Sequence, residues 1–122
     1  SQLAFLSIDK VCQYLQIKKD FVIDCSQYDN GHLTGQDRVL DICLQEKTDE
    51  YVNASGGADL YSKKAFEEKG VRLLFIQSQK NVYAQFTHDF VPWLSIIDVM
   101  MFNSPQKIQT MLTAYDLIDG RD

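Results

Sequence analysis

Apolar and polar positions alternate in two different patterns over the first two thirds of the chain. Near the start, apolar residues recur at the spacing of a helix that buries one face: Ile8, Val11, Cys12 and Leu15. Ser7 precedes this stripe and is placed to cap the helix. The apolar run Phe21-Val22-Ile23 is too short for a helix and predicts a buried strand, with a polar, turn-rich loop from Asp24 to Gly31 behind it.

The same order, helix and then strand, is repeated twice more. A second helix is predicted from about Gly35, where Thr34 and Asp37 have the spacing of a capping box. Its apolar face consists of Val39, Leu40, Cys43 and Leu44. Residues 50–53 then predict a second short strand.

Two adjacent glycines mark the sharpest turn in the chain, in Ser55-Gly56-Gly57. A third helix is expected directly after this turn, with four residues facing inward: Ala58, Tyr61, Ala65 and Phe66. Gly70 is placed to end the helix as its C′ residue, and residues 71–76 predict the third strand.

Short apolar strands separated by helices indicate right-handed crossovers and a parallel sheet. We therefore expect an α/β fold: a three-layer α/β/α sandwich around a small parallel sheet, comparable to half of a Rossmann-like fold, with helix-strand repeats and C-terminal helices. A chain of 122 residues fits a single domain over residues 1–122. Because three strands make a small sheet, we expect this domain to be a fragment or the C-terminal domain of a longer chain.

The last third of the chain has a different pattern. Residues 77–89 predict a long loop, and Pro92 suits the first turn of a helix that runs to about Phe102. Ser104 and Pro105 then have the order of an N-cap and N1 residue before a last helix. Residues after about Tyr115 are expected to fray.

Charge narrows the range of partners. The formal net charge is −5, from 17 acidic and 12 basic residues, so there is no basic field to attract nucleic acid or anionic lipid. No apolar run has the length of a membrane helix, and the first residues lack the order of a signal peptide. We expect a cytoplasmic protein with no nucleic-acid partner and no membrane insertion.

The residues with reactive side chains give weak signals. Cys12 and Cys43 lie on apolar helix faces and are interpreted as small apolar residues, whereas Cys25 follows a predicted strand, where a nucleophile is possible. His32 and His88 have no further ligands at metal-site spacing, so no metal is expected and no cofactor is indicated.

Loops that follow parallel strands are the usual ligand sites of such a sheet. Three loops qualify: Asp24 to Tyr28, Asn53 to Gly57, and the stretch from Gln77. The glycine turn is open to two interpretations, an anion site at a helix N-terminus or a tight strand-to-helix connection. Asp98 interrupts an apolar helix and must face water or be paired, and Tyr83, Phe86 and Trp93 either pack or stack on a sugar or base.

Three motifs, in order, carry a family resemblance: Gly-Gly-x-x-x-Tyr from Gly56 to Tyr61, Tyr-x-Gln from Tyr83 to Gln85, and Leu-Ser-Ile-x-Asp from Leu94 to Asp98. From Leu6 to about Leu112 the chain resembles the C-terminal half of the WbqC-like family. The resemblance implies a role in bacterial O-antigen, lipopolysaccharide and other surface-polysaccharide biosynthesis, with a transferase activity on sugar precursors. The family's N-terminal half would then be a partner that supplies any catalytic group, and this part alone would be inactive.

The resemblance implies a set of substrate-binding residues: Arg38, Asn53, Ser55, Gly56, Gly57, Tyr61, Tyr83, Gln85, Ser95 and Asp98. Arg38 would pair with a carboxylate or a ligand phosphate, and Asn53 and Gln85 would orient sugar hydroxyls. The first hypothesis is therefore part of an enzyme that binds a nucleotide-linked or otherwise activated sugar. The second is a non-catalytic interaction domain that docks a partner of the same pathway through Tyr83, Phe86 and Trp93. The sequence leaves open the catalytic residues, and whether the chain forms a homo-oligomer.

Overall fold

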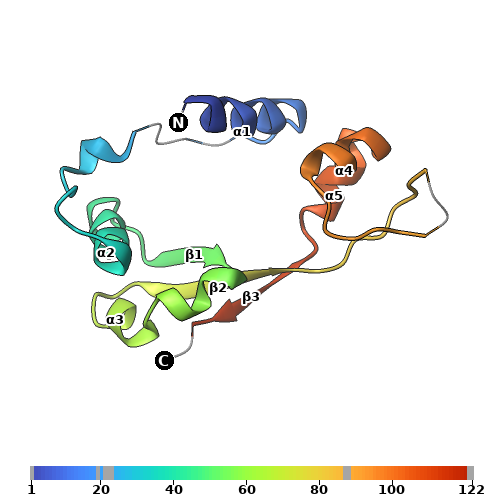
Figure 1. The fold of residues 1–122 in the computed structure, drawn as a ribbon. Helices are drawn as coiled ribbons and strands as arrows, with labels where there is room; N and C mark the ends of the chain where they lie inside the picture. Colours follow the sequence, from blue (N-terminus) through green and yellow to red (C-terminus); the bar gives the residue numbers. More distant parts are fainter. Residues whose placement is uncertain (1, 19, 21–23, 87–88, 121–122) are drawn as a thin grey trace. The chain divides into compact units, whose positions relative to one another are not determined.

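The computed structural model describes residues 2–18, 20, 24–86 and 89–120. The chain forms two compact units that interleave along the sequence, and each is described by itself. Unit 1 comprises Ser1–Ile23 and Gln79–Ala114, and unit 2 comprises Asp24–Ser78 and Tyr115–Asp122. Figure 1 shows the course of the chain through its helices and strands. That residues 1–122 form one domain stays a prediction.

Unit 2 contains a small sheet with the strand order β1-β2-β3 (Figure 1). β1 (Glu50–Ala54) and β2 (Arg72–Ser78) are parallel, with Val52 opposite Leu74. β3 (Tyr115–Asp119) runs antiparallel to β2. The α/β class, the parallel pair and the two predicted strands at these positions are thus confirmed. The predicted strand at 21–23 lies outside the described residues.

Helices cover one face of this sheet. α2 (Gly35–Gln45) contributes Leu40 and Cys43 to the core, and α3 (Lys63–Glu67) contributes Phe66. They pack with Leu73 and Phe75 of β2 and with Val71, which directly precedes β2. Ala58, Tyr61 and Ala65 pack around them as predicted. Gly70 ends the turn after α3 with a φ of +75°, and the Gly70 and Val71 amides bond back to Glu67 and Phe66 as in a Schellman motif.

Two 3₁₀ helices complete unit 2. η1 (Cys25–Tyr28) is capped by Asp24, whose carboxylate accepts from the Ser26 amide at 2.9 Å. η2 (Ser55–Leu60) begins with the glycine turn. The prediction of an α-helix directly after Gly57 is wrong, because the chain first makes η2 and Ser62 then caps α3. Thr34 is the N-cap of α2, but its side chain makes no capping bond, so the predicted capping box does not form.

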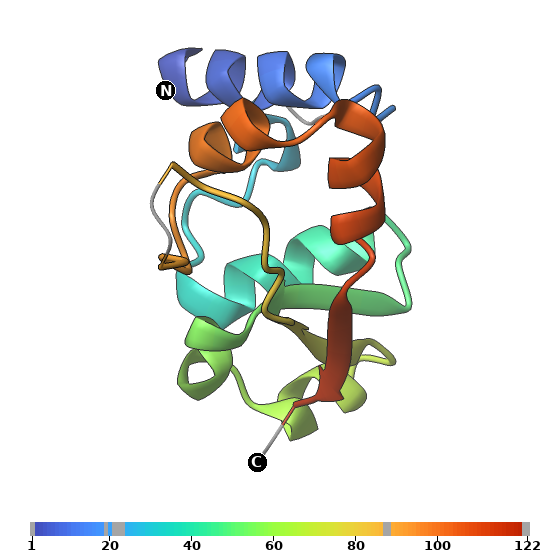
Figure 2. The same ribbon diagram turned by 90° about the vertical axis from the view of Figure 1, so that its right-hand side faces the viewer.

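The described part of unit 1 contains a long loop and three helices: α1 (Gln2–Tyr14), α4 (Ile96–Phe102) and α5 (Pro105–Met111). Figure 2 shows α4 and α5 joined by a short turn, where Ser104 caps α5 and Pro105 starts it as predicted. Leu15 and Ile108 are almost fully buried, and the Gln109 amide donates to the Leu15 carbonyl at 2.7 Å. This bond ties the end of α1 to α5.

Three expectations for the ends of elements are wrong. α1 begins at Gln2, so Ser7 lies inside the helix, where its hydroxyl donates to the Ala4 carbonyl. α4 begins at Ile96, not near Pro92, because Ser95 provides the cap. Residues 115–119, which were expected to fray, form β3, and their backbone pairs with β2. Among the described residues, no helix combines the length and the apolar character needed to cross a bilayer.

Candidate functional site

The Asp98 carboxylate is the centre of a polar cluster in unit 1. The Tyr83 hydroxyl donates to Asp98 Oδ2 at 2.5 Å, and Gln85 Nε2 donates to the same oxygen at 3.0 Å. Tyr83 is buried, while Asp98 is half-buried. A carboxylate in this setting is stable because two donors compensate for the water that it loses.

Gln85 also fixes the loop that precedes α4. Its Oε1 accepts from the Val91 amide at 2.8 Å, and its Nε2 donates to the Val91 carbonyl at 3.1 Å. One amide side chain thereby satisfies both backbone groups of a residue that has no place in a helix or strand. The Tyr-x-Gln segment and Asp98 are held together by this arrangement.

Ser95 sets the position of Asp98. Its hydroxyl oxygen accepts from the Ile97 amide at 3.3 Å and its carbonyl accepts from the Asp98 amide at 2.9 Å, which starts α4. Asp98 then falls in the first turn, where a negative charge is favoured by the helix dipole. The Leu-Ser-Ile-x-Asp motif is therefore a helix start that delivers a carboxylate to the cluster.

The hydrogen bond to Asp98 also changes the acidity of Tyr83. Donating to the carboxylate raises the pKa of the Tyr83 phenol above its usual value of 10.0, and burial adds to this rise. The phenol is consequently a donor to Asp98 over the whole physiological pH range.

An open pocket of about 640 Å³ lies beside the cluster. Gln85, Ser95 and Asp98 form its polar part. The other lining residues are apolar: Phe86, Val91, Leu94, Ile97, Met101 and Phe102. Phe86 is 95% exposed and Met101 is 76% exposed, so much of this wall is in contact with water. We call this feature the Asp98 pocket.

Arg38 belongs to a separate network in unit 2. Its Nε donates to Asn30 Oδ1 at 3.1 Å, and its Nη2 lies 3.3 Å from the Cys25 sulfur. Asn30, which is only 2% exposed, donates in turn to Asp41 at 2.7 Å, and Gln45 donates to the same carboxylate. These contacts join the loop that includes η1 to α2, so the structure gives Arg38 a positioning role there.

The glycine turn shows why one of its two glycines is needed. A Cβ at Gly57 would lie 3.2 Å from the Asn53 amide nitrogen and 3.7 Å from the Tyr61 ring, whereas a Cβ at Gly56 would meet nothing within 4 Å. Asn53 Oδ1 accepts from the Ala54 amide at 2.7 Å. Close packing therefore explains Gly57, Asn53 and Tyr61, and it favours the interpretation of a tight connection.

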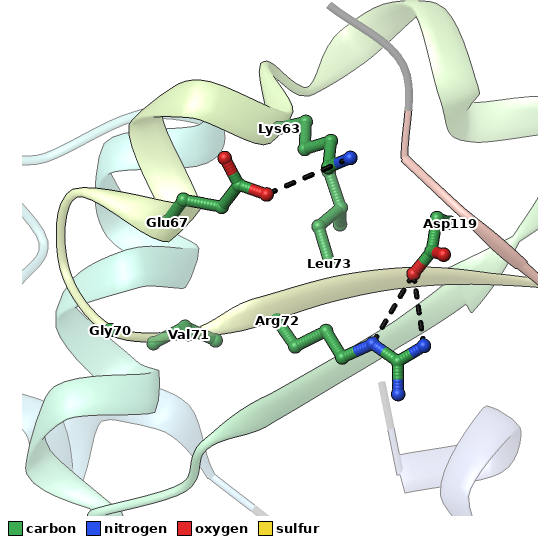
Figure 3. Close-up of a pocket in the computed structure, with 7 residues that line it drawn as sticks. All are labelled: Lys63, Glu67, Gly70, Val71, Arg72, Leu73 and Asp119. Carbon is green, nitrogen blue, oxygen red and sulfur yellow. Dashed lines mark hydrogen bonds and ion pairs between the residues drawn. The ribbon is translucent and has the colours of Figure 1, made fainter.

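A second pocket, of about 420 Å³, lies in unit 2 and is lined by charged residues (Figure 3). Arg72 donates to Asp119 at 3.1 Å through Nη2, and Lys63 lies 3.7 Å from Glu67. Figure 3 shows that each cation points at its own carboxylate. Since these exposed charges neutralise each other, the pocket offers no excess charge to a ligand.

The structure therefore brings together four of the ten residues that the resemblance implied: Tyr83, Gln85, Ser95 and Asp98. Arg38 and the glycine-turn residues lie in unit 2 and make separate clusters, with Ser55 and Gly56 exposed. The apolar wall of the Asp98 pocket was missed. A signal for it is present, because α4 is apolar on nearly all sides, and a short helix of that kind leaves apolar side chains facing outward.

The remaining candidates add no reactive group to this cluster. Cys43 is buried, which raises the pKa of its thiol and disfavours the thiolate. Cys25 is exposed but belongs to the Arg38 network. His88 lies outside the described residues. Within the described part of the chain, no three side chains of His, Cys, Asp or Glu are grouped as a metal site would require.

The fold and this cluster define a small α/β protein with an open, mainly apolar pocket beside a hydrogen-bonded carboxylate. The chain belongs to the WbqC-like protein family, whose model matches residues 1–110. The resemblance in the three motifs is thus confirmed at the level of the family. No curated protein and no solved structure matches the chain.

Proposed function

We propose that this chain binds the sugar part of an activated precursor in the synthesis of a bacterial surface polysaccharide, as part of a transferase. The observation that carries the proposal is that Gln85, Ser95 and Asp98 all line the Asp98 pocket. A carboxylate accepts hydrogen bonds from sugar hydroxyls and a serine hydroxyl can donate one to them, while an adjacent aromatic wall such as Phe86 packs against the apolar face of a sugar ring. The family membership supports the pathway.

The chemistry of the pocket assigns it the sugar and not the activating group. Among the described residues that line the pocket, none is a lysine or an arginine. A phosphate would meet the Asp98 carboxylate without a compensating cation from these residues, which is unfavourable. In this proposal the activating group stays outside the pocket, and the residues that break its bond to the sugar are not assigned.

Calorimetric titration with a panel of nucleotide sugars tests the proposal. Asp98→Asn keeps the shape of the side chain but removes its charge, and we expect it to weaken sugar binding about tenfold, since hydrogen bonds to a charged acceptor are about twice as strong as neutral ones. Asp59→Asn is the matched control, because Asp59 is exposed in η2 and far from the pocket along the chain. Absence of heat with every nucleotide sugar, or equal affinities of both variants, would contradict the proposal.

A second function is favoured by the exposed apolar residues beside the pocket. Trp93 is 72% exposed and has a φ of +61°, a strained conformation for an aromatic residue that needs support from its surroundings. Large exposed aromatic side chains such as Trp93 and Phe86 are typical anchors of protein interfaces. A non-catalytic domain that docks a protein of the same pathway is the alternative.

Trp93 separates the two functions, because it is not among the residues that line the Asp98 pocket. If the chain is a docking domain, Trp93→Ala weakens its complex with the partner in co-purification experiments and leaves nucleotide-sugar binding intact. Leu60→Ala is the control, because it also removes an exposed apolar side chain, but one that belongs to unit 2. Unchanged co-purification of the Trp93→Ala variant would rule out docking through this residue.

A further inference from the structure

The polar residues of the Asp98 pocket have little hydrogen-bonding capacity left for a ligand. Gln85 uses both Nε2 protons, one on Asp98 and one on Val91, and its Oε1 accepts from the Val91 amide. Asp98 Oδ2 already accepts from Tyr83 and Gln85. Ser95 accepts from the Ile97 amide. The internal bonds that build the pocket thus occupy most of its polar groups.

Two groups remain. Among the described residues, no hydrogen bond reaches Asp98 Oδ1, and the hydroxyl proton of Ser95 is not given to a protein acceptor. A carboxylate oxygen only accepts, so Oδ1 requires a hydroxyl or an N–H donor from the ligand, and Ser95 can donate to one acceptor. The pocket can therefore satisfy only a few polar groups of any molecule that fills it.

The rest of the wall favours apolar substituents. Six of the nine lining residues are apolar: Phe86, Val91, Leu94, Ile97, Met101 and Phe102. A hydroxyl turned toward this wall loses its hydrogen bonds to water and gains no partner. A methyl group there is removed from water, which makes the binding free energy more favourable. An ordinary hexose has a hydroxyl on nearly every ring carbon, and each hydroxyl turned toward this wall would lack a partner.

We propose that the Asp98 pocket selects a sugar with apolar substituents, a deoxy sugar or an N-acylated amino sugar, with one of its remaining hydroxyl or N–H groups on Asp98. This inference rests on the proposed function and names the substrate class of the same site. The methyl of the deoxy or acyl group contacts the wall formed by Ile97 and Met101, and the sugar brings neither a phosphate nor a carboxylate into the pocket.

Methyl glycosides test this selectivity without an activating group. The probes are the methyl glycosides of glucose, 6-deoxyglucose and N-acetylglucosamine, measured by saturation-transfer NMR. We expect the last two to bind at least about tenfold more tightly than the glucose derivative, the usual discrimination for one apolar group in an apolar pocket.

Met101→Gln tests the wall itself. Met101 is exposed, so an isosteric polar side chain leaves folding intact, and we expect the preference over glucose to fall by about threefold, as for part of a buried methyl group. Leu3→Gln, an equally exposed position on α1 that does not line the pocket, is the control and keeps the full preference.

The outcomes separate this inference from the function on which it rests. If the glucose derivative binds as tightly as the other two, the selectivity is overturned while sugar binding stands. If Met101→Gln keeps the full preference, the assignment of the apolar wall is overturned. If no glycoside binds and no nucleotide sugar gives heat, the proposed function itself fails.

Discussion

Single hydrogen bonds to a carboxylate hold the candidate site together. Tyr83 and Gln85 approach Asp98 from a loop, and both donate to the same oxygen. Removing one donor leaves the half-buried Asp98 charge with fewer hydrogen bonds. This costs more stability than removing donor and acceptor together. The same contact contributes to stability and to the position of the carboxylate, so it is the first place to test.

Tyr83→Phe should destabilise the protein by about 1–2 kcal/mol at neutral pH, because a bond to a charged acceptor is lost. The pKa of Tyr83 is raised in the folded state, by the bond to Asp98 first, so the folded protein favours the protonated phenol. The contribution of Tyr83 is then complete below pH 10, the usual value, and declines as the pH rises through the raised pKa. Urea unfolding at pH 7 and pH 11 should show a gap between wild type and variant that narrows at the higher pH.

Tyr14→Phe provides the control for this measurement. Tyr14 is half exposed in α1 and makes no described side-chain hydrogen bond, so its variant should match the wild type within about 0.5 kcal/mol. A gap for Tyr83→Phe that is constant, or that widens with pH, would contradict the link between the phenol and Asp98.

Gly57 and Gly56 form a matched pair at the residue scale. Gly57→Ala places a Cβ 3.2 Å from the Asn53 amide nitrogen, so the Asn53 side chain and its bond to the Ala54 amide must shift. Gly56→Ala meets nothing within 4 Å. Thermal unfolding should show a loss of about 1 kcal/mol for Gly57→Ala and almost no change for Gly56→Ala. Equal effects would mean that packing on Asn53 does not explain the glycine.

At the scale of elements, the apolar pattern of the sequence predicted the elements that pack against the core. It missed β3, which is held by backbone pairing, and the start of α4, which is set by a capping residue. The apolar face of α2 was found because its residues recur at helical spacing, and β1 and β2 were found as short runs that contain apolar residues. β3 was missed because all five of its residues are exposed, so its sequence carries no buried face. Backbone pairing with β2, which any sequence can provide, holds it in place.

The start of α4 was missed for a related reason. Pro92 fits the first turn of a helix. However, Trp93 adopts a φ of +61°, and α4 begins only after its N-cap residue Ser95. Local preference alone does not decide between two adjacent start signals, and here the bonds of Gln85 to Val91 hold the preceding segment out of a helix.

Gly120→Ala tests the attachment of β3. Gly120 is buried, its amide donates to the Leu73 carbonyl at 3.0 Å, and an added Cβ would lie 2.8 Å from the Leu73 side chain in the core. Overpacking of this kind costs about 1–3 kcal/mol. Hydrogen exchange should show faster opening of the β3 amides in Gly120→Ala and no change in Gly31→Ala, where a Cβ meets nothing within 4 Å. Unaltered hydrogen-exchange protection of the β3 amides would show that the Leu73 side chain shifts to accommodate the added Cβ without a cost in stability.

At the scale of the whole molecule, the candidate site shows how far sequence reasoning reaches. The order of the motifs placed Tyr83, Gln85, Ser95 and Asp98 in one family pattern, and the family match supports that pattern. Their meeting at one carboxylate depends on a loop that doubles back through the Gln85 bonds, which no periodicity encodes. Arg38 and the glycine turn belong to the same motif series but lie in the other unit.

The net charge of −5 gives the last prediction, on the activating group of the sugar. A nucleotide diphosphate brings further negative charge to a negatively charged protein, and no lysine or arginine is among the described residues that line the pocket. UDP-N-acetylglucosamine should therefore bind no more tightly than the methyl glycoside of N-acetylglucosamine in calorimetry. Raising the salt concentration should strengthen its binding, because salt screens the repulsion. Much tighter binding of the nucleotide sugar that weakens with salt would instead reveal a cation at the phosphates, and would place the activating group in a site of its own.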